Sequence, residues 1–469
     1  MRTENHNGGL GDAGGDEAHD AASEAETKRH RRAFVVALLV IATVALGVRV
    51  TFVMTRGTDR SLYDAAFYQG EAELLADGKG FVDPLLYRSE GRIGQAAQHP
   101  PLTALVLTPV AMFSDGDTPM RLTFCVVGAI GVFLIGLLGA ELSGRRTGLI
   151  AAGIATVYPL LWVNDGVVMA ESLAITLTVA ALLVMYRLLR APRVGLAVGA
   201  GVLCGLAALA RAELLLLGGF LAVGIIVRLR GPAFRQRAVL AGALLTAMVV
   251  VVAPWVGYNL SRFERPVLMT TDGDVNLMFS TCQSTFYGPD IGGPHYFCLV
   301  PLPPGAADHS VEAEYFRKIA LRYTRAHALR YPVVVAARLG RIWSVFQPGD
   351  AIVNFEGRPS WVMGLGLAFY YPLLALAFVG AGILHRRRRA WWLLMIPPVL
   401  TVAIALVSWG QTRYRAVAEP TIVLLAAVAI GALVDHVGRT RIRTRSPAVD
   451  GAAAAAVAPV VSPSSGSNR

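Results

Sequence analysis

Long apolar runs constrain this chain of 469 residues more than any other feature. A helix needs about 20 predominantly apolar residues to cross the hydrocarbon core of a bilayer. About ten runs approach that length, at residues 33–54, 119–141, 148–164, 166–189, 194–210, 213–229, 237–258, 361–384, 391–409 and 416–435. The sequence therefore predicts an all-α, polytopic membrane protein with about ten transmembrane helices.

The net charge of +11 follows membrane topology and does not indicate a nucleic-acid surface. Arginine-rich clusters lie at the ends of alternate apolar runs, at residues 28–32, 145–146, 187–193, 228–237, 386–389 and 439–445. The positive-inside rule places these clusters and both termini in the cytoplasm. Arginine greatly outnumbers lysine, and Ala, Gly and Val are abundant, which suggests a GC-rich bacterial genome and hence a bacterial plasma membrane. We expect no nucleic-acid partner.

One apolar stretch, residues 102–113, does not fit the alternation. Its roughly 12 residues are too few to cross a bilayer, and counting it would place the later arginine clusters outside. We therefore expect an interfacial helix on the outer leaflet. With that assignment, residues 55–118 and 259–360 face outward.

This topology divides the chain into five parts. They are a disordered cytoplasmic N-terminus (1–32), an N-terminal transmembrane catalytic module that includes the outer loop 55–118 (33–258), a large outer loop with amphipathic helices (259–360), C-terminal transmembrane helices (361–435), and a basic and then disordered cytoplasmic tail (436–469). The two ends are assigned from their polar, low-complexity composition.

The large outer loop contains a helical pattern and two cysteines. Apolar residues recur every four positions from residue 315, which predicts a helix that is interrupted at Pro332. Residues 333–346 then carry arginines beside apolar residues, as expected of a helix at the membrane surface. Cys282 and Cys298 lie in an oxidising location, so they are candidates for a disulfide, with two free thiols as the alternative.

Charged residues near the span ends that lie outside the cytoplasmic clusters gather at the outer surface. They are Asp64, Asp165, Glu171, Arg211, Glu213, Arg413, Arg415 and Glu419. The middle and inner parts of the spans are almost purely apolar, whereas a transporter is expected to keep polar groups near the midplane. The pattern therefore predicts chemistry at the outer interface.

These residue types suit a lipid-linked substrate. The planar guanidinium of arginine binds phosphate with paired donors, so Arg211, Arg413 and Arg415 are candidates for a lipid phosphate. Asp64, in an aromatic frame ending at Tyr68, can accept a proton from an attacking hydroxyl. Together they suit a displacement in which an acceptor hydroxyl attacks a sugar carbon and the lipid phosphate leaves.

Most of these residues also have an interpretation without chemistry. Asp64 also suits a helix N-cap or a solvated acid, and Arg211 also suits an ion pair with Glu213. Arg413 and Arg415 also suit contact with lipid head groups.

Two further polar residues differ in how easily they are explained. His99 precedes two prolines, which force an extended path, so it also suits a simple turn. Glu171 lies in apolar surroundings and needs either an ion-pair partner or a raised pKa.

An ordered series of short motifs resembles the bacterial GT-C membrane glycosyltransferases related to protein O-mannosyltransferases and to the lipid A aminoarabinose transferase. The motifs are Tyr63-Asp64 through Tyr68, His99-Pro100-Pro101-Leu102, Arg121-Leu122, Gly144-Arg145-Arg146, Met169 to Leu173, Ala210-Arg211-Ala212-Glu213, Ala253-Pro254-Trp255 with Asn259, Arg338 to Pro348, and Arg413-Tyr414-Arg415. The resemblance covers about residues 33–435 and rests on the order of the set.

The resemblance implies a GT-C-like fold, a polyprenyl-phosphate sugar donor, an active site on the outer face and inversion at the anomeric carbon. It assigns the role of catalytic base to Asp64. The implied substrate-binding residues are Tyr68, His99, Asp165, Glu171, Arg211, Glu213, Asn259, Arg413, Tyr414 and Arg415.

The chain departs from this family pattern in two places. Many relatives have two adjacent acids in the first outer loop, whereas here Asp64 stands alone. Many have an arginine where this chain has Tyr258, and Arg262 is a candidate replacement. Some GT-C enzymes hold a divalent metal, which Asp64, Asp165 and Glu171 have the chemistry to bind. We nevertheless predict no metal and no other cofactor.

The sequence leaves the transferred sugar, hexosyl or pentosyl, and the acceptor open. The acceptor is an envelope glycan, lipid or protein. Two other functions remain: a transporter or flippase of lipid-linked sugar, and a non-catalytic membrane protein of envelope assembly.

Overall fold

The computed structural model describes residues 13–56, 64–114, 116–302, 308–352 and 356–445. Within these residues every regular element is a helix, and the only β-pairing is an isolated bridge between Val82 and Gln95. The predicted all-α class is confirmed.

Six helices of the described part are long and apolar enough to cross a membrane. They are α1 (Ala13–Thr55), α5 (Asp117–Ser143), α8 (Glu171–Arg190), α11 (Phe234–Arg262), α16 (Ser360–Arg386) and α18 (Glu419–Arg445). The multi-pass character that the apolar runs predicted is confirmed.

A seventh candidate span is broken into two pieces. Helix α6 (Arg145–Val157) and the segment that starts at α7 (Pro159–Trp162) differ in direction by 65°. The break lies at Tyr158, whose backbone is extended (ψ 111°) because the proline that follows disfavours the helical region at this position. The remaining predicted spans correspond to shorter helices, α9 (Val194–Ala210), α10 (Leu215–Arg228) and α17 (Ile396–Val407). The count of ten therefore stays a prediction.

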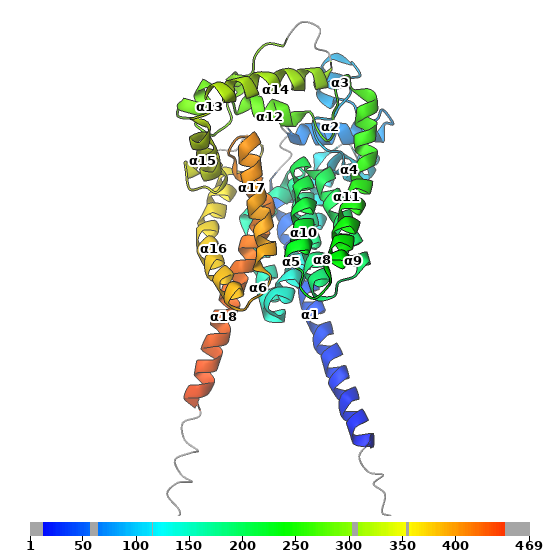
Figure 1. Cartoon of the computed structure of the whole chain (residues 1–469), viewed down its shortest axis with the longest axis vertical. Coiled ribbons are helices and arrows are strands. Elements are labelled where there is room, and N and C mark those ends of the chain that lie inside the picture. Colours follow the sequence, from blue (N-terminus) through cyan, green and yellow to red (C-terminus); the bar gives the residue numbers. More distant parts are fainter. Residues whose placement is uncertain (1–12, 57–63, 115, 303–307, 353–355, 446–469) are drawn as a thin grey trace, which may run out of the picture.

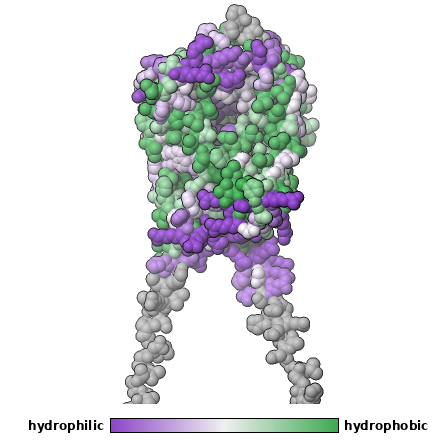
Figure 2. Space-filling view, viewed as in Figure 1, coloured by the Kyte–Doolittle hydropathy of each residue, from purple (hydrophilic) through white to green (hydrophobic). Residues whose placement is uncertain are grey.

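The spans form one bundle with polar ends. Helices α1 and α18 leave the bundle at the same end, and α14 (His309–Ala326) lies across the opposite end (Figure 1). Figure 2 shows a broad apolar belt between two hydrophilic bands, as expected for a protein surrounded by lipid.

The end of the bundle remote from the termini is covered by a cap of shorter helices (Figure 1). Besides α14, the cap contains α2 (Asp64–Ala76), α3 (Pro84–Glu90), α4 (Leu102–Ala111), α12 (Asp272–Phe279), α13 (Gln283–Tyr287) and α15 (Tyr331–Ile342). All of these helices come from the two segments predicted to face outward, so these segments meet on one side of the bundle.

The apolar stretch 102–113 forms α4, a helix of ten residues. Its buried side, which includes Leu107 and Ala111, packs with α2 and α5 in one apolar cluster, while Leu105 and Phe113 are exposed. A short helix with one buried and one exposed apolar side is consistent with the predicted interfacial placement.

The N-terminal prediction needs a correction. Helix α1 begins at Ala13, so residues 13–32 are helical where disorder was predicted; residues 1–12 lie outside the described part. Alanine and glutamate favour helices, and Glu24 pairs with Lys28 one turn on at 2.6 Å. Helix α18 likewise continues to Arg445, through the first part of the predicted tail.

Residues 333–346 of the large outer loop, predicted as a helix at the membrane surface, also differ from expectation. Pro332 lies in the first turn of α15, where its missing N–H costs nothing. Arg338 is fully buried and Arg341 nearly so, instead of facing lipid head groups. Arg338 donates to the carbonyls of Ser280, at 2.7 Å, and Ala405, at 3.1 Å. It therefore joins the cap to α17.

A buried ion pair fixes α1 inside the bundle. Arg49 Nε lies 2.7 Å from Asp165 Oδ2, and both side chains are almost fully buried. The hydroxyl of Ser172 donates to the other carboxylate oxygen of Asp165. A Cβ at Gly128 of α5 would lie 2.1 Å from Asp165 Oδ2, so only glycine leaves room for this carboxylate.

Candidate functional site

A cavity of about 520 Å³ lies beneath the cap, within the size range of small-ligand sites. The space-filling view is hollowed between α17 and α10, below α12 (Figure 2). Eight of the predicted site residues line the cavity: Asp64, Tyr68, His99, Glu171, Arg211, Glu213, Arg413 and Tyr414. Four apolar side chains of α10 and α17 form another wall: Leu216, Ile404, Leu406 and Val407. The cavity thus joins a charged part to an apolar part.

Asp64 is held ionised by an arginine from the other end of the sequence. It is the first residue of α2, where the helix dipole favours a negative charge. Arg413, in the 3₁₀ segment η6 (Thr412–Ala418), donates from Nη1 to Asp64 Oδ2 at 2.9 Å. Burial alone would raise the pKa of Asp64, but Arg413 and then His99 outweigh burial and lower it to about 2.

Glu171 is shared by three arginines. Its Oε1 lies 2.8 Å from Arg211 Nη1, 3.6 Å from Arg358 Nη2 and 3.9 Å from Arg413 Nε. Arg211 also donates to Glu213, at 2.6 Å. Glu171 therefore has the ion-pair partners that its apolar surroundings require. Its carboxylate in turn holds the three guanidinium groups close together beside the cavity.

Tyr414 places an aromatic ring beside two of these arginines. The guanidinium carbons of Arg211 and Arg413 lie 5.6 and 5.5 Å from its ring centroid, within the range of cation–π attraction. Its hydroxyl accepts a hydrogen bond from Ser408 at 3.0 Å. The ring therefore helps to fix both cations at the cavity wall.

His99 lies between two carboxylates. Its Nε2 is 3.8 Å from Asp64 Oδ1, and its Nδ1 is 3.7 Å from Asp272 Oδ2. The ring stacks on Tyr68 with centroids 4.6 Å apart and meets Phe67 edge-on at 5.2 Å. This aromatic frame orients the imidazole at a bend in the chain, with one ring nitrogen toward each carboxylate.

Three predicted site residues lie outside the cavity lining. Asp165 pairs with Arg49 in the bundle, and Arg415 is buried against Glu419, with Nε 2.6 Å from Oε1. Asn259 is fully buried and accepts from Arg262 Nη2 at 3.0 Å. The structure gives all three a packing role. Arg415 is buried against an acid, whereas the alternative interpretation expected contact with lipid head groups.

Arg262, the candidate replacement for the family's arginine, does not line the cavity. Its Nη1 donates to the carbonyl of Phe81 at 2.9 Å and to Gln95 at 3.0 Å, while its guanidinium carbon lies 4.4 Å from the ring centroid of Tyr258. Arg262 therefore joins the end of α11 to the first outer loop.

Sequence reasoning missed Asp272, Glu356 and Arg358. Asp272 lines the cavity, whereas Glu356 accepts hydrogen bonds from both Arg358 and Arg413 behind it. All three belong to the predicted large outer loop but lie outside the part of it, residues 315–346, in which a helical pattern was recognised. The two acids at 272 and 274, separated by one glycine, were the available signal for Asp272.

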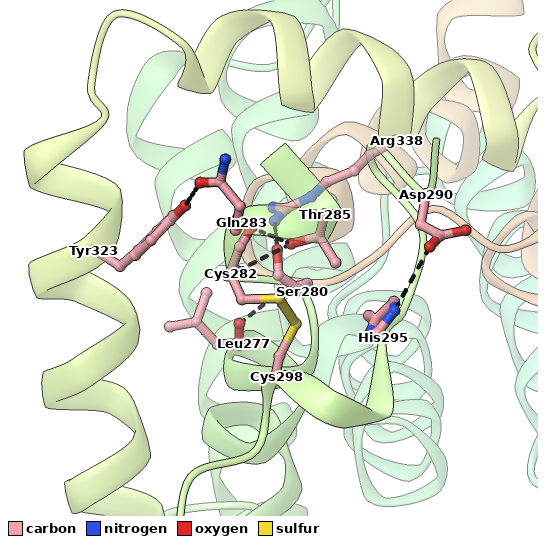
Figure 3. Close-up of a disulfide and its surroundings, with 10 residues drawn as sticks. All are labelled: Leu277, Ser280, Cys282, Gln283, Thr285, Asp290, His295, Cys298, Tyr323 and Arg338. Carbon is pink, nitrogen blue, oxygen red and sulfur yellow. Dashed lines mark hydrogen bonds and ion pairs between the residues drawn. A yellow bond between two sulfur atoms is a disulfide. The ribbon is translucent and has the colours of Figure 1, made fainter. Parts of the chain in front are cut away.

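A disulfide joins Cys282 to Cys298, and in Figure 3 it lies beside α14, the helix that carries Tyr323. Cys282 follows α12, the helix that carries Asp272, and Arg338 donates to the carbonyl of Ser280 in the same turn (Figure 3). The loop wall of the cavity is thus tied both covalently and by a buried arginine.

The acids of the cavity are arranged for ion pairs. Among the described residues, no group of three or more His, Cys, Asp or Glu side chains has a geometry that would hold a metal ion. The expectation that no metal or other cofactor is required stays a prediction.

Comparisons with known proteins agree with the predicted resemblance. Residues 98–258, which contain His99, Glu171 and Arg211, match the family model described as dolichyl-phosphate-mannose-protein mannosyltransferase. A comparison with curated protein sequences found no significant match.

Two solved structures of the oligosaccharyltransferase AglB from Archaeoglobus fulgidus share the fold. One is in complex with an inhibitory peptide and a dolichol-phosphate (TM-score 0.53, 14% identity, 90% of this chain and 52% of that chain). The other is the apo form (TM-score 0.53, 13% identity, 88% and 52%). This chain spans about half the length of those proteins.

A third structure is ArnT from Cupriavidus metallidurans bound to undecaprenyl phosphate (TM-score 0.41, 16% identity, 85% and 77%), a similarity too weak to carry an argument by itself. The AglB matches and the family match together confirm that this chain resembles the GT-C membrane glycosyltransferases and has a GT-C-like fold.

Proposed function

We propose that the chain is a membrane glycosyltransferase. It transfers a sugar from a polyprenyl-phosphate donor to an envelope glycan, lipid or protein, at the outer face of a bacterial plasma membrane and with inversion. The observation that carries the proposal is the cavity in which Asp64 and Arg413 meet beside an apolar wall. Both lie in the predicted motifs.

The two parts of the cavity suit the two parts of such a donor. The apolar wall of α10 and α17 suits the first prenyl units, which are poorly soluble in water. Arg211 and Arg413 now contact carboxylates, and a phosphate that enters between them replaces one anionic partner by another. The dolichol-phosphate named in one AglB structure supports this class of donor.

The reaction follows from the placement of the charges. Asp64 is ionised at neutral pH and exposes part of its carboxylate to the cavity, so it can orient and deprotonate an acceptor hydroxyl. The hydroxyl oxygen attacks the anomeric carbon, and the bonding electrons move to the phosphate oxygen. Arg413 and Arg211 stabilise the charge that develops there. Attack opposite the leaving phosphate inverts the anomeric carbon.

The test uses purified protein in proteoliposomes. The donors are undecaprenyl-phosphate monosaccharides, hexoses and pentoses, with tritium in the sugar, and the acceptor is an envelope extract. We expect one donor to label the extract and Asp64→Asn to lower the rate at least 100-fold, the usual contribution of general base catalysis.

The matched control is Asp77→Asn, because Asp77 follows the same helix and is exposed, with Lys79 as its partner. An unchanged rate in Asp64→Asn would contradict the catalytic role. Movement of labelled donor across the vesicle membrane without covalent transfer would instead favour a transporter.

A further inference from the structure

The cavity contains a second carboxylate whose position is set by the chain fold. Asp272 opens α12 in the large outer loop, and its side chain is 27% exposed at the cavity wall. The backbone N–H of Thr271 donates to the carbonyl of Ala97 at 2.8 Å, and the hydroxyl of Thr270 donates to the carbonyl of Gln98. These bonds hold the loop alongside the residues that precede His99.

His99 therefore has one carboxylate at each ring nitrogen. The distances of 3.8 Å to Asp64 and 3.7 Å to Asp272 are longer than hydrogen bonds. Such contacts often tighten only when a substrate is bound. The other charged and titratable groups near His99 and Asp272 are Asp64 and Tyr68 from α2, His309 from α14, and Arg413 from η6.

We propose that His99 and Asp272 take up the proton that the acceptor hydroxyl loses to Asp64. This inference rests on the proposed function and adds a route for the proton. Asp64 contacts the hydroxyl, His99 carries the proton onward, and Asp272 positions His99 and holds the proton at the end of the step.

The transfer balances without any further reactant. As the acceptor oxygen bonds to the anomeric carbon and the phosphate leaves with the bonding electrons, the hydroxyl proton moves to Asp64 Oδ1. It passes to His99 Nε2 while Nδ1 gives its own proton to Asp272 Oδ2. Asp64 is again a carboxylate, His99 is neutral in its other tautomer, and Asp272 is a carboxylic acid that later loses its proton to water.

The electrostatics favour this direction. Arg413 holds Asp64 as a carboxylate with a pKa of about 2, so Asp64 keeps a proton poorly. Burial, opposed by His99 and reinforced by Asp64, raises the pKa of Asp272 to about 6. Asp272 therefore holds a proton more readily than Asp64 does.

The test compares Asp272→Asn with Asp274→Asn in the transfer assay. Asp274 lies on the same helix but pairs with Arg317 at 3.1 Å and does not line the cavity. We expect Asp272→Asn to lower kcat about 10- to 100-fold with KM unchanged. The wild-type rate should fall below about pH 6, where Asp272 becomes protonated, and Asp272→Asn should lose this dependence.

A second measurement does not depend on transfer. In protein labelled with ¹⁵N-histidine in nanodiscs, Asp272→Asn should change the ¹⁵N chemical shifts of the His99 ring, whereas Asp274→Asn should not. Identical His99 chemical shifts in Asp272→Asn and wild type would overturn the inference, and so would an unchanged rate and pH profile. A wild-type protein that transfers no sugar would contradict the proposed function, while the chemical shifts would still decide whether the His99–Asp272 pair exists.

Discussion

Arg413 and Arg415 are two residues apart in η6, but they belong to different regions of the molecule. Arg413 faces the cavity and contacts Asp64 of α2 and Glu356 of the outer loop. Arg415 is fully buried in the bundle against Glu419, and its guanidinium carbon lies 3.7 Å from the ring centroid of Tyr370.

The two regions differ in how their charges are balanced. We call the Arg415–Glu419 pair closed, because it is buried and each oxygen of Glu419 already has a partner: Arg415 at one, and Tyr158, which donates at 2.7 Å, at the other. The cavity contains more carboxylates than guanidinium groups, and several carboxylates share one arginine. A closed pair holds helices together, whereas a shared and partly open cluster can exchange a partner for a ligand. The following predictions test that contrast.

The largest effect is expected in the closed region. Arg415→Leu leaves Glu419 buried without its counter-charge, which costs about 3–5 kcal/mol of folding stability. The thermal unfolding midpoint in detergent should fall strongly, and little protein should elute as a single species. The double variant Arg415→Leu/Glu419→Leu should recover part of the loss. A wild-type midpoint for Arg415→Leu would show that the two regions do not differ as proposed.

The corresponding change in the cavity should reduce activity instead of stability. Arg413→Ala removes a phosphate contact and is expected to slow transfer about 100-fold, which corresponds to about 3 kcal/mol of transition-state stabilisation. Its unfolding midpoint should stay within a few degrees of wild type, because Asp64 is partly open to the cavity and Glu171 and Glu356 keep other arginine partners. Measured together, rate and midpoint separate Arg413 from Arg415. A large fall in the unfolding midpoint of Arg413→Ala, with the transfer rate per folded protein unchanged, would show that Arg413 belongs to the closed region.

The disulfide tests how firmly the loop wall of the cavity must be held. Cys282 and Cys298 are 16 residues apart, and a crosslink of that span contributes about 2–3 kcal/mol in the chain-entropy account. Cys282→Ser/Cys298→Ser should therefore lower the unfolding midpoint and the transfer rate together. Reductant should affect wild type but not the double variant. A rate that falls with an unchanged midpoint would contradict this explanation.

The smallest effect is expected from His309, which lies 2.9 Å from Asp83 and 3.2 Å from Glu312. Hydrogen bonds to Asp83 and Glu312 raise the pKa of His309 to about 10, from an ordinary value of 6.5. Its stabilisation is complete below pH 6.5 and is lost as the pH rises toward 10. After allowance for solvent screening, we expect about 1–2 kcal/mol.

The midpoint of wild type should therefore fall more steeply between pH 7 and 10 than that of His309→Gln. His327→Gln is the matched control, because the ring of His327 stacks on Tyr323 at 4.1 Å instead of facing acids. Equal slopes in wild type and His309→Gln would refute the assigned ion pairs.

The helical bundle and most of the charged residues of the cavity were predictable from the sequence. Apolar length identifies spans, and Glu171, Arg211 and Arg413 stand out because a charge in such surroundings needs an explanation. What spacing does not reveal is the direction of each side chain. In the 3₁₀ turn of η6, Arg413 and Arg415 point to opposite environments, and an apolar pattern does not distinguish them.

The loop residues were less predictable for a different reason. Asp272, Glu356 and Arg358 reach the site or its immediate surroundings through long-range contacts, such as the bond between Thr271 and Ala97. Such contacts leave no period in the sequence. The helicity of residues 13–32 was missed because polar composition suggested disorder, although alanine, glutamate and a one-turn ion pair favour a helix.

Gly128 has a consequence for how this chain can change over evolutionary time. Its missing side chain provides the space that the Asp165 carboxylate fills, and that carboxylate neutralises Arg49. A larger residue at 128 displaces the acid, and loss of the acid leaves a buried cation unpaired. Gly128, Asp165 and Arg49 therefore evolve together. A substitution at one of these positions is tolerated only with compensating substitutions at the other two.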